Sequence, residues 1–442
     1  MESHVLLNLC RLISVAVLAA SATPSQADGA ETEMSTVSAK ASLPAQQMTL
    51  EAVVADVLAH NPEVHFYSAE IAAAKGEART AETWANPELS TSIGDKRVTG
   101  GGAASEGVAW AVSIQQTFEW PGRIPLRKAI ANQQVQLAEL GFAQFKTTLA
   151  ARTRLTAFGL SAAQQKATAA RTVADRFHAL REVLVQRDPA GITPQLELRI
   201  IEATEIIMLR KVSEVSLAEQ TAMLELNHLR GQSWQRTMTI APVNLTFTAA
   251  PEADALLAGA RTNNFEIRMR QVELAQQGFK VSLAHKGRYP SFTVGPYFSQ
   301  ERASDRERQV GISLSMPLPL WNRNEGDLET AMARQQQAET SMAVTQRAVE
   351  RQVVEQALVY QTKLNEMAKW RPEAVAEFRT AADLADRHYR LGAVPITTYV
   401  ELQKQYLDAV EVLLDTKREA LDAGQQLELL TGLDIHAVHT SP

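Results

Sequence analysis

The chain has 442 residues, with 44 Lys and Arg against 50 Asp and Glu, a net charge of −6 and one cysteine. This balance, without a basic run, argues against a nucleic-acid partner. Cys10 is the only cysteine, which excludes intramolecular disulfides and cysteine-based metal sites. The nine histidines are scattered, and the sequence has no HExxH motif, nucleophile elbow or phosphate-binding glycine loop. We therefore expect neither an enzyme nor a bound metal or cofactor.

Residues 1–27 are typical of a secretory signal peptide. An apolar stretch from Leu12 to Ala22 precedes Ser25-Gln26-Ala27, a small-x-small cleavage site. Cys10 lies before this stretch, which argues against lipidation. No later run reaches about 18 apolar residues, so any membrane insertion would use strands. Residues 28–48 are small and polar, which indicates a flexible segment.

Two β-hairpins are predicted from alternation of apolar residues with small or polar ones. Their strands lie at about 88–94 and 108–118, and at about 291–299 and 309–317. The charged link Gln300–Arg308 is expected to form the loop of the second hairpin. The apolar face of the strands contains Trp110, Val112, Ile114, Phe292, Val294, Ile312 and Leu314.

Four strands cannot close a barrel, and a sheet exposed to lipid must close because open edges leave backbone groups unpaired in hydrocarbon. Three copies of the chain would supply twelve strands. The alternative is an α+β protein whose own helices cover the apolar face of the sheet. Alternation alone does not separate these two interpretations.

The chain is predicted to be an internal duplication. Asn61-Pro62-Glu63-Val64 matches Asn264-Phe265-Glu266-Ile267 at a spacing of 203 residues. A period near 200 is too long for a solenoid and indicates two copies of one unit. The expected organisation is a first repeat at 49–231, a linker at 232–251, a second repeat at 252–432 and a tail at 433–442.

Long helices are predicted in both repeats, at 49–83, 125–186 and 194–230, and again at 252–286, 325–390 and 395–431. The middle helix of each repeat would be roughly 90 Å long, and the two outer helices could stack end to end beside it. The apolar seams are narrow, as in Val349, Val353 and Ala357, which is typical of side-by-side coiled-coil packing. Helices without a wide apolar stripe are poorly suited to covering a sheet.

Four motifs in this duplicated frame resemble the TolC-like outer-membrane factors, or outer membrane efflux proteins, of Gram-negative bacteria. They are Trp84–Leu89 (WANPEL), Phe118–Arg123 (FEWPGR), Pro317–Gly326 (PLPLWNRNEG) and Tyr389–Ala393 (YRLGA). The resemblance covers about Leu50 to Leu433. The second and third motifs are most similar to the branch that works in cobalt, zinc and cadmium efflux.

The resemblance implies a mainly α protein with membrane β structure. The fold would be a homotrimer whose twelve-stranded outer-membrane barrel continues into a long periplasmic α-helical barrel. The channel would be passive, and a periplasmic adaptor would join it to an inner-membrane pump of the resistance-nodulation-division (RND) kind. The apolar strand face would contact outer-membrane lipid, while Ser113, Gln115, Ser313 and Ser315 would face the lumen.

The resemblance also places functional residues at the far periplasmic end. The two helical turns would contact the adaptor through Asp188, Gly191, Ile192, Thr193, Leu391, Gly392 and Ala393. Thr398 and Glu401 fall on two positions that are acidic and ring the pore in the family pattern, and Tyr389 matches a tip tyrosine. Val394 stands where the family has a gating arginine, so the resemblance does not predict how the gate of this chain is held closed.

Three Glu401 carboxylates around a pore would attract cations, although a solvated helix face explains one Glu almost as well. Export of heavy-metal cations is the predicted function. The alternatives are a channel for drugs or other organic solutes, a type I secretion channel, and a periplasmic coiled-coil scaffold or adaptor that never enters a membrane.

Overall fold

The computed structural model describes residues 46–99, 105–186, 192–241, 244–303, 305–371, 374–433 and 438–441. All of them belong to one unit, which begins at Ala45. The predicted signal peptide lies outside the described residues. No helix in the described part of the chain is both long and apolar enough to cross a membrane.

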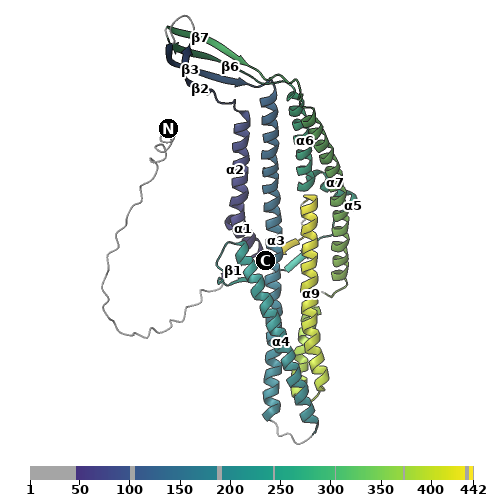
Figure 1. The fold of residues 1–442 in the computed structure, drawn as a ribbon. Helices are drawn as coiled ribbons and strands as arrows, with labels where there is room; N and C mark the ends of the chain where they lie inside the picture. Colours follow the sequence, from purple (N-terminus) through teal and green to yellow (C-terminus); the bar gives the residue numbers. More distant parts are fainter. Residues whose placement is uncertain are drawn as a thin grey trace, which may run out of the picture. The chain divides into compact units, whose positions relative to one another are not determined.

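The two predicted hairpins are confirmed, and they join into one antiparallel sheet at one end of the helices (Figure 1). Its strands are β2 (Glu88–Val98), β3 (Ser105–Phe118), β6 (Phe292–Arg302) and β7 (Arg306–Ser315), in the order β2-β3-β6-β7. The pairing of β3 with β6 connects the two repeats.

The charged link Gln300–Arg308 was expected to be a loop, and this expectation is wrong. Strand β6 extends to Arg302 and strand β7 begins at Arg306, so the strands take up most of the link, with Glu301 opposite Glu307 and Arg302 opposite Arg306. Backbone pairing tolerates charge there because both faces of a hairpin end can be solvated, and because Lys96 bonds to both glutamates.

The register places all seven predicted lipid-facing residues on one face. Directly opposite residues share a face, and Ile114 lies opposite Leu89 while Pro296 lies opposite Ile312. Val112 lies opposite Phe298. We call this the apolar face, and its members are Leu89, Ile93, Val108, Trp110, Val112, Ile114, Phe292, Val294, Pro296, Phe298, Val310, Ile312 and Leu314.

In the first repeat the expected helix at 49–83 is two helices, α1 (Leu50–His60) and α2 (Pro62–Glu82). The break lies at Asn61, because a proline disfavours helical backbone at the preceding residue and the Asn61 side chain caps α2. The middle helix α3 (Arg123–Gln186) and the third helix α4 (Ile192–Leu229) form as predicted.

The second repeat shows the same break at Asn264, between α5 (Ala253–Asn263) and α6 (Phe265–Lys286). The expected helix at 325–390 is also wrong as one element. It consists of α7 (Glu325–Ala368) and α8 (Ala374–Arg390), so α7 ends shortly before Pro372, which cannot continue a helical hydrogen-bond ladder. The last helix is α9 (Ile396–Thr431).

Two small sheets lie midway along the helices. β1 (Gln46–Met48) pairs with β4 (Met238–Ile240), and β5 (Asn244–Phe247) pairs with β8 (Val438–Ser441). The predicted linker and the predicted tail thus contribute strands, and the end of the segment predicted to be flexible, 28–48, is strand β1.

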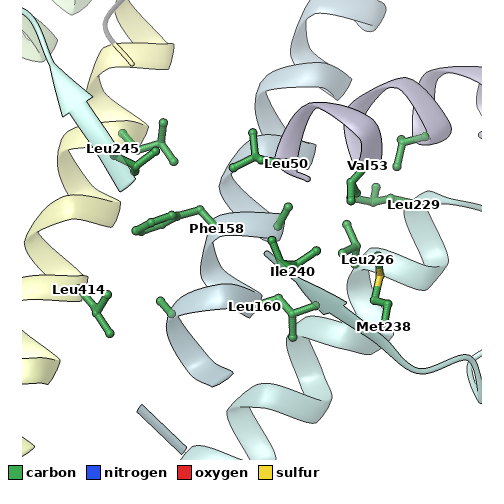
Figure 2. Packing of buried hydrophobic residues seen from close by; sticks show 14 of the residues in the cluster. Leu50, Val53, Phe158, Leu160, Leu226, Leu229, Met238, Ile240, Leu245 and Leu414 are labelled. Carbon is green, nitrogen blue, oxygen red and sulfur yellow. The ribbon is translucent and has the colours of Figure 1, made fainter. Parts of the chain in front are cut away.

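The largest core lies around β4 and β5, where Leu50, Phe158, Leu226, Ile240 and Leu414 are buried together (Figure 2). These residues come from α1, α3, α4, β4 and α9. The core therefore holds the helices of both repeats at the level where α4 ends and α2 begins.

Candidate functional site

The apolar face of the sheet is exposed to solvent in the single chain. The exposed fraction is 84% for Ile93, 80% for Val310 and 77% for Ile312. Burying one such side chain contributes about 1.5 to 3 kcal/mol, so leaving a whole face of them in water is strongly unfavourable. The α+β alternative, in which helices cover this face, is therefore wrong. None of the helices that the structure describes covers this face.

The opposite face of the sheet consists of small and polar residues. Gln115 Nε2 donates to Ser313 Oγ at 3.4 Å, and the Ser313 hydroxyl donates to the carbonyl of Gly295 at 3.1 Å. Thr117 and Thr293 are joined at 3.0 Å between their hydroxyl oxygens. Near these residues the face presents neutral oxygen and amide groups, and at the hairpin end it presents Lys96, Glu301 and Glu307, all of which suit contact with water.

Aromatic rings mark both ends of the apolar face. Trp110 and Phe298 lie 5.2 Å apart between ring centroids towards the hairpin end, and Phe118 and Phe292 stack at 5.5 Å next to the helices. On β3 the segment from Trp110 to Phe118 has nine residues, and on β6 the segment from Phe292 to Phe298 has seven, close to the length of about 9 to 11 residues with which a tilted strand crosses the apolar core of a membrane. Aromatic belts at both borders are typical of membrane barrels.

The two outer strands of the sheet, β2 and β7, each pair on one side only among the described residues. Each offers a row of backbone donors and acceptors for another strand. The sheet is therefore incomplete in the same way on both edges.

At the other end of the helices, α8 and α9 meet in a tight turn. Gly392 has φ 72°, a left-handed conformation that glycine adopts without strain, and its N–H donates to the carbonyl of Tyr389 at 2.9 Å. Leu391, Gly392 and Ala393 are exposed, with Leu391 at 78%.

Of the other four predicted adaptor-contact residues, Asp188 and Gly191 lie outside the described residues, and Ile192 and Thr193 begin α4. The structure therefore shows an exposed turn at the second tip only.

The predicted gate residues differ in their surroundings, since Tyr389 is half-buried while Thr398 and Glu401 are exposed. Tyr389 turns inward, stacks on Tyr399 at 5.3 Å between ring centroids, and donates its hydroxyl to Glu197 Oε2 at 3.3 Å. This bond links α8 to α4, and thus one repeat to the other. Tyr399 is fully buried, and burial raises the pKa of its phenol well above the ordinary value of 10, so it stays neutral.

Thr398 and Glu401 lie instead on an exposed stripe of α9. Gln405 Nε2 donates to Glu401 Oε1 at 2.9 Å, one turn further along the helix. Asp408 is exposed on the same stripe, seven residues after Glu401, and was not predicted from the sequence. Heptad spacing from Glu401 is the signal that could have identified it.

Three ion pairs connect the first-repeat helices to the second-repeat helices above this end. Lys166 Nζ lies 2.6 Å from Asp415, and Lys211 Nζ lies 2.6 Å from Glu411, both on α9. Arg176 on α3 pairs with Asp383 on α8. In each pair the first repeat supplies the cation. The contacts hold α3 and α4 against α8 and α9.

Among the described residues, no group of three or more His, Cys, Asp or Glu side chains is arranged to hold a metal ion.

Comparison with known proteins identifies relatives of one kind. The family model described as "Outer membrane efflux protein" matches residues 256–433. The cobalt-zinc-cadmium resistance protein CzcC of Cupriavidus metallidurans is 24% identical over 298 residues, which cover 66% of this chain and 68% of the relative.

Solved structures of outer membrane channels share the fold. The CmeC outer membrane channel of Campylobacter jejuni superposes with a TM-score of 0.71 at 15% identity, covering 87% of this chain and 85% of that one. The open state of the MtrE outer membrane channel of Neisseria gonorrhoeae superposes with a TM-score of 0.65 at 14% identity, covering 87% and 88%. The likeness thus extends over both repeats.

Proposed function

Because the chain belongs to the outer membrane efflux protein family, we propose that it is the passive exit channel of a tripartite efflux system in the outer membrane of a Gram-negative bacterium. The observation that carries this proposal is the sheet itself. It has an uncovered apolar face, a polar opposite face and two open edges.

A homotrimer satisfies all three features of the sheet at once. If β7 of one copy pairs with β2 of the next, three copies close a twelve-stranded barrel and leave no edge in hydrocarbon. The apolar face then contacts lipid, and the face with Ser113, Gln115 and Ser313 lines a water-filled lumen.

The helices extend from the sheet into the periplasm in this proposal. Their ends, with the exposed turn at Leu391–Ala393, would meet a periplasmic adaptor, and an RND-type pump in the inner membrane would supply the energy. Exposed Leu391 is suited to such a contact, since an isolated apolar side chain at the tip of a turn gains by being covered.

Heavy-metal cations are the proposed substrate class. The similarity to CzcC supports this choice, and so does the acidic stripe of Glu401 and Asp408 near the helix ends. In a trimer the stripe would supply six carboxylates around the narrow end of the duct, which would raise the local concentration of cations.

The channel proposal is tested by expressing the chain in a Gram-negative host and separating the two membranes. We expect the protein in the outer membrane, soluble only in detergent, with a mass about three times that of one chain and a heat-modifiable mobility. In planar bilayers it should form conducting pores. Recovery as a single chain in the water-soluble periplasmic fraction would instead support the scaffold alternative.

The substrate proposal has a separate test. Deleting the gene should lower tolerance of the host to zinc, cobalt or cadmium, and the wild-type gene should restore it. If metal tolerance is unchanged while sensitivity to organic drugs rises, the drug-efflux alternative holds. Loss of a secreted protein from the medium would favour the type I secretion alternative.

A further inference from the structure

At the hairpin end of the sheet, the acidic and the basic residues of β6 and β7 lie on opposite faces. The segment Gln300–Arg308 mixes acidic and basic residues closely in the sequence. Because strands β6 and β7 extend into it from both ends, alternation places Glu301 and Glu307 on the polar face and Arg302, Arg306 and Arg308 on the apolar face. A charge-balanced segment thus becomes two surfaces of opposite sign.

The acidic surface is already neutralised in part within the chain. Lys96 on β2 lies 2.7 Å from Glu301 and 3.0 Å from Glu307, so its side chain reaches across β3 on the polar face. The β3 residue opposite Lys96 is Gly107, which has no side chain to block this path. Both glutamates of the segment are therefore bound on the side away from the arginines.

The basic surface lacks such compensation. Arg302, Arg306 and Arg308 are exposed, and we call them the arginine patch. Arg302 lies directly opposite Arg306, a like-charge pair that is unfavourable without an anion between the guanidinium groups. Among the described residues neither has an ion-pair partner, and Arg308 Nε donates only to the neutral Gln300 Oε1, at 3.3 Å.

The acidic residues near the arginine patch do not neutralise it, so the patch keeps an excess of positive charge. Glu106 is bound by Arg97 at 2.7 Å, and Asp95 is separated from Arg302 by strand β3. Asp305 lies in the turn between the two strands and offers one carboxylate to three guanidinium groups. The excess charge lies immediately beyond the apolar face, since Val310 and Phe298 are the next residues of that face on β7 and β6.

We propose that the arginine patch binds the phosphate groups of phosphorylated glycolipid headgroups in the outer leaflet of the membrane. The inference rests on the proposed function, which places this end of the sheet at the outer surface. Arginine binds phosphate through two parallel N–H donors, and three arginines on two paired strands present several such forks to one headgroup. The acyl chains of the same lipid would lie against Val310 and Phe298, which a free phosphate ion could not exploit.

The test measures lipid binding to the purified trimer in neutral detergent by native mass spectrometry. The probes are bis-phosphorylated lipid A, enzymatically dephosphorylated lipid A and inorganic phosphate. We expect the wild type to bind the phosphorylated lipid most tightly and inorganic phosphate weakly. Each arginine near an anionic lipid contributes roughly fivefold, so R302Q/R306Q/R308Q should weaken binding of phosphorylated lipid A by on the order of 100-fold.

A matched control removes three exposed arginines from the helices, R334Q/R379Q/R387Q, and should leave lipid binding unchanged. The inference is overturned if the patch variant keeps the wild-type preference for phosphorylated lipid, or if the control loses it equally. It is also overturned if inorganic phosphate binds as tightly as the lipid. Outer-membrane fractionation and pore conductance of the same variants report separately on the proposed function, because a channel can insert and conduct without binding phosphorylated lipid.

Discussion

Asn61 and Asn264, which occupy equivalent positions in the two repeats, make the same pair of hydrogen bonds. The side-chain oxygen of Asn61 accepts from Glu63 N at 2.9 Å, and that of Asn264 accepts from Glu266 N at 2.9 Å. Each amide nitrogen then donates to the end of the last helix of its repeat, at 2.8 Å to the carbonyl of Leu229 and at 2.9 Å to that of Leu430. One side chain thus starts one helix and holds the end of another, which confirms the expected end-to-end stacking.

We predict that N61A lowers the free energy of unfolding by about 2 to 3 kcal/mol, because it removes the cap of α2 and leaves a buried carbonyl without a donor. N61S should lower it less, since serine caps a helix but is too short to reach Leu229. The measurement is the urea midpoint of the helical circular dichroism signal in detergent. N264A and N264S should give the same order, and N132A, at an exposed site on α3, should match the wild type.

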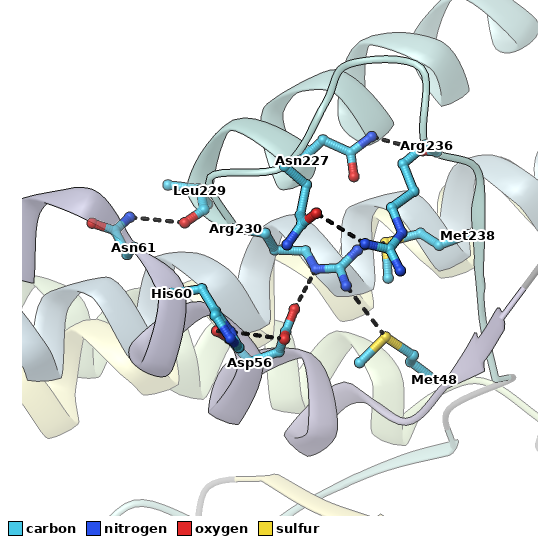
Figure 3. A network of polar contacts seen from close by, with 10 residues as sticks. Met48, Asp56, His60, Asn61, Asn227, Leu229, Arg230, Arg236 and Met238 are labelled. Atoms are coloured by element: carbon cyan, nitrogen blue, oxygen red, sulfur yellow. Dashed lines mark hydrogen bonds and ion pairs between the residues drawn. The ribbon is translucent and has the colours of Figure 1, made fainter.

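The two repeats differ next to these asparagine contacts, at what we call the joint between the outer helices of each repeat. In the first repeat Arg230 is buried and its Nε lies 2.5 Å from Asp56 Oδ2, while Nη1 and Nη2 approach the sulfur atoms of Met238 and Met48 (Figure 3). The matching positions in the second repeat are Gly259 and Thr431. A Cβ at Gly259 would lie 2.7 Å from a methyl carbon of Leu433, so that joint is filled by packing.

Breaking the ion pair between Asp56 and Arg230 should lower the free energy of unfolding strongly. We expect D56A to lower the free energy of unfolding by about 3 to 5 kcal/mol, because it leaves the buried Arg230 without its carboxylate. Adding R230M to D56A should recover part of the loss, since no buried charge then remains. H60A is the control, because His60 is exposed and its loss keeps the Arg230 pair intact. A D56A protein as stable as H60A would show that the pair does not stabilise the fold.

A third prediction separates the two faces of β7. Ile312 and Ser315 are both exposed in the single chain, but they lie on the apolar and polar faces. We expect I312R to reduce the heat-modifiable trimer in the outer-membrane fraction, because arginine near the middle of the lipid-facing band costs about 2 to 4 kcal/mol. S315R should assemble normally. Equal assembly of both variants would contradict lipid contact at Ile312.

Much of the sheet could be predicted from the sequence. Period-two alternation identified four strands and assigned residues such as Val112 and Ile312 to one face, because a lipid-facing strand repeats that pattern along its length. The extension of β6 and β7 to Arg302 and Arg306 was not predicted, since charged residues carry no alternation of hydropathy. The arginine patch was therefore hidden in a segment expected to be a loop.

The helix breaks were harder to predict because they depend on tertiary contacts. Asn61 precedes a proline and offered a local signal, but Asn264 precedes Phe265 and breaks the helix while its side chain bonds to Leu430, far away in the sequence. The gate residues behave similarly. Glu401 was identified from a family pattern, whereas the inward position of Tyr389 depends on its contacts with Tyr399 and Glu197.

A fourth prediction concerns the acidic stripe of α9. We expect E401Q and D408N each to reduce the preference of the pore for cations, and the double variant to reduce it most, because neutral amides keep the shape but remove the charge. The measurement is the reversal potential in planar bilayers under a KCl gradient, at low salt where screening is weak. E252Q, at an exposed site immediately before α5, is the charge-matched control. Unchanged reversal potentials would place the stripe away from the ion path.

The last prediction concerns alkaline pH. Tyr360 on α7 is fully buried, and its hydroxyl donates to the carbonyl of Thr248 at 2.7 Å. Burial, with a smaller contribution from the charge of Glu428, raises the pKa of Tyr360 from 10.0 to about 12. The unfolded chain therefore releases this proton at a lower pH than the folded chain does. The stabilisation is complete below pH 10 and is lost as the pH rises towards 12.

Y360F should be less stable than the wild type at pH 7, because it lacks the hydrogen bond to Thr248. It should lose less stability than the wild type between pH 10 and 12, since phenylalanine has no proton to release. The measurement is the urea midpoint of both proteins across this range, and the difference between them isolates Tyr360 from the other titrating groups. Parallel decline of the two proteins would show that Tyr360 ionises with the same pKa in the folded and unfolded chains.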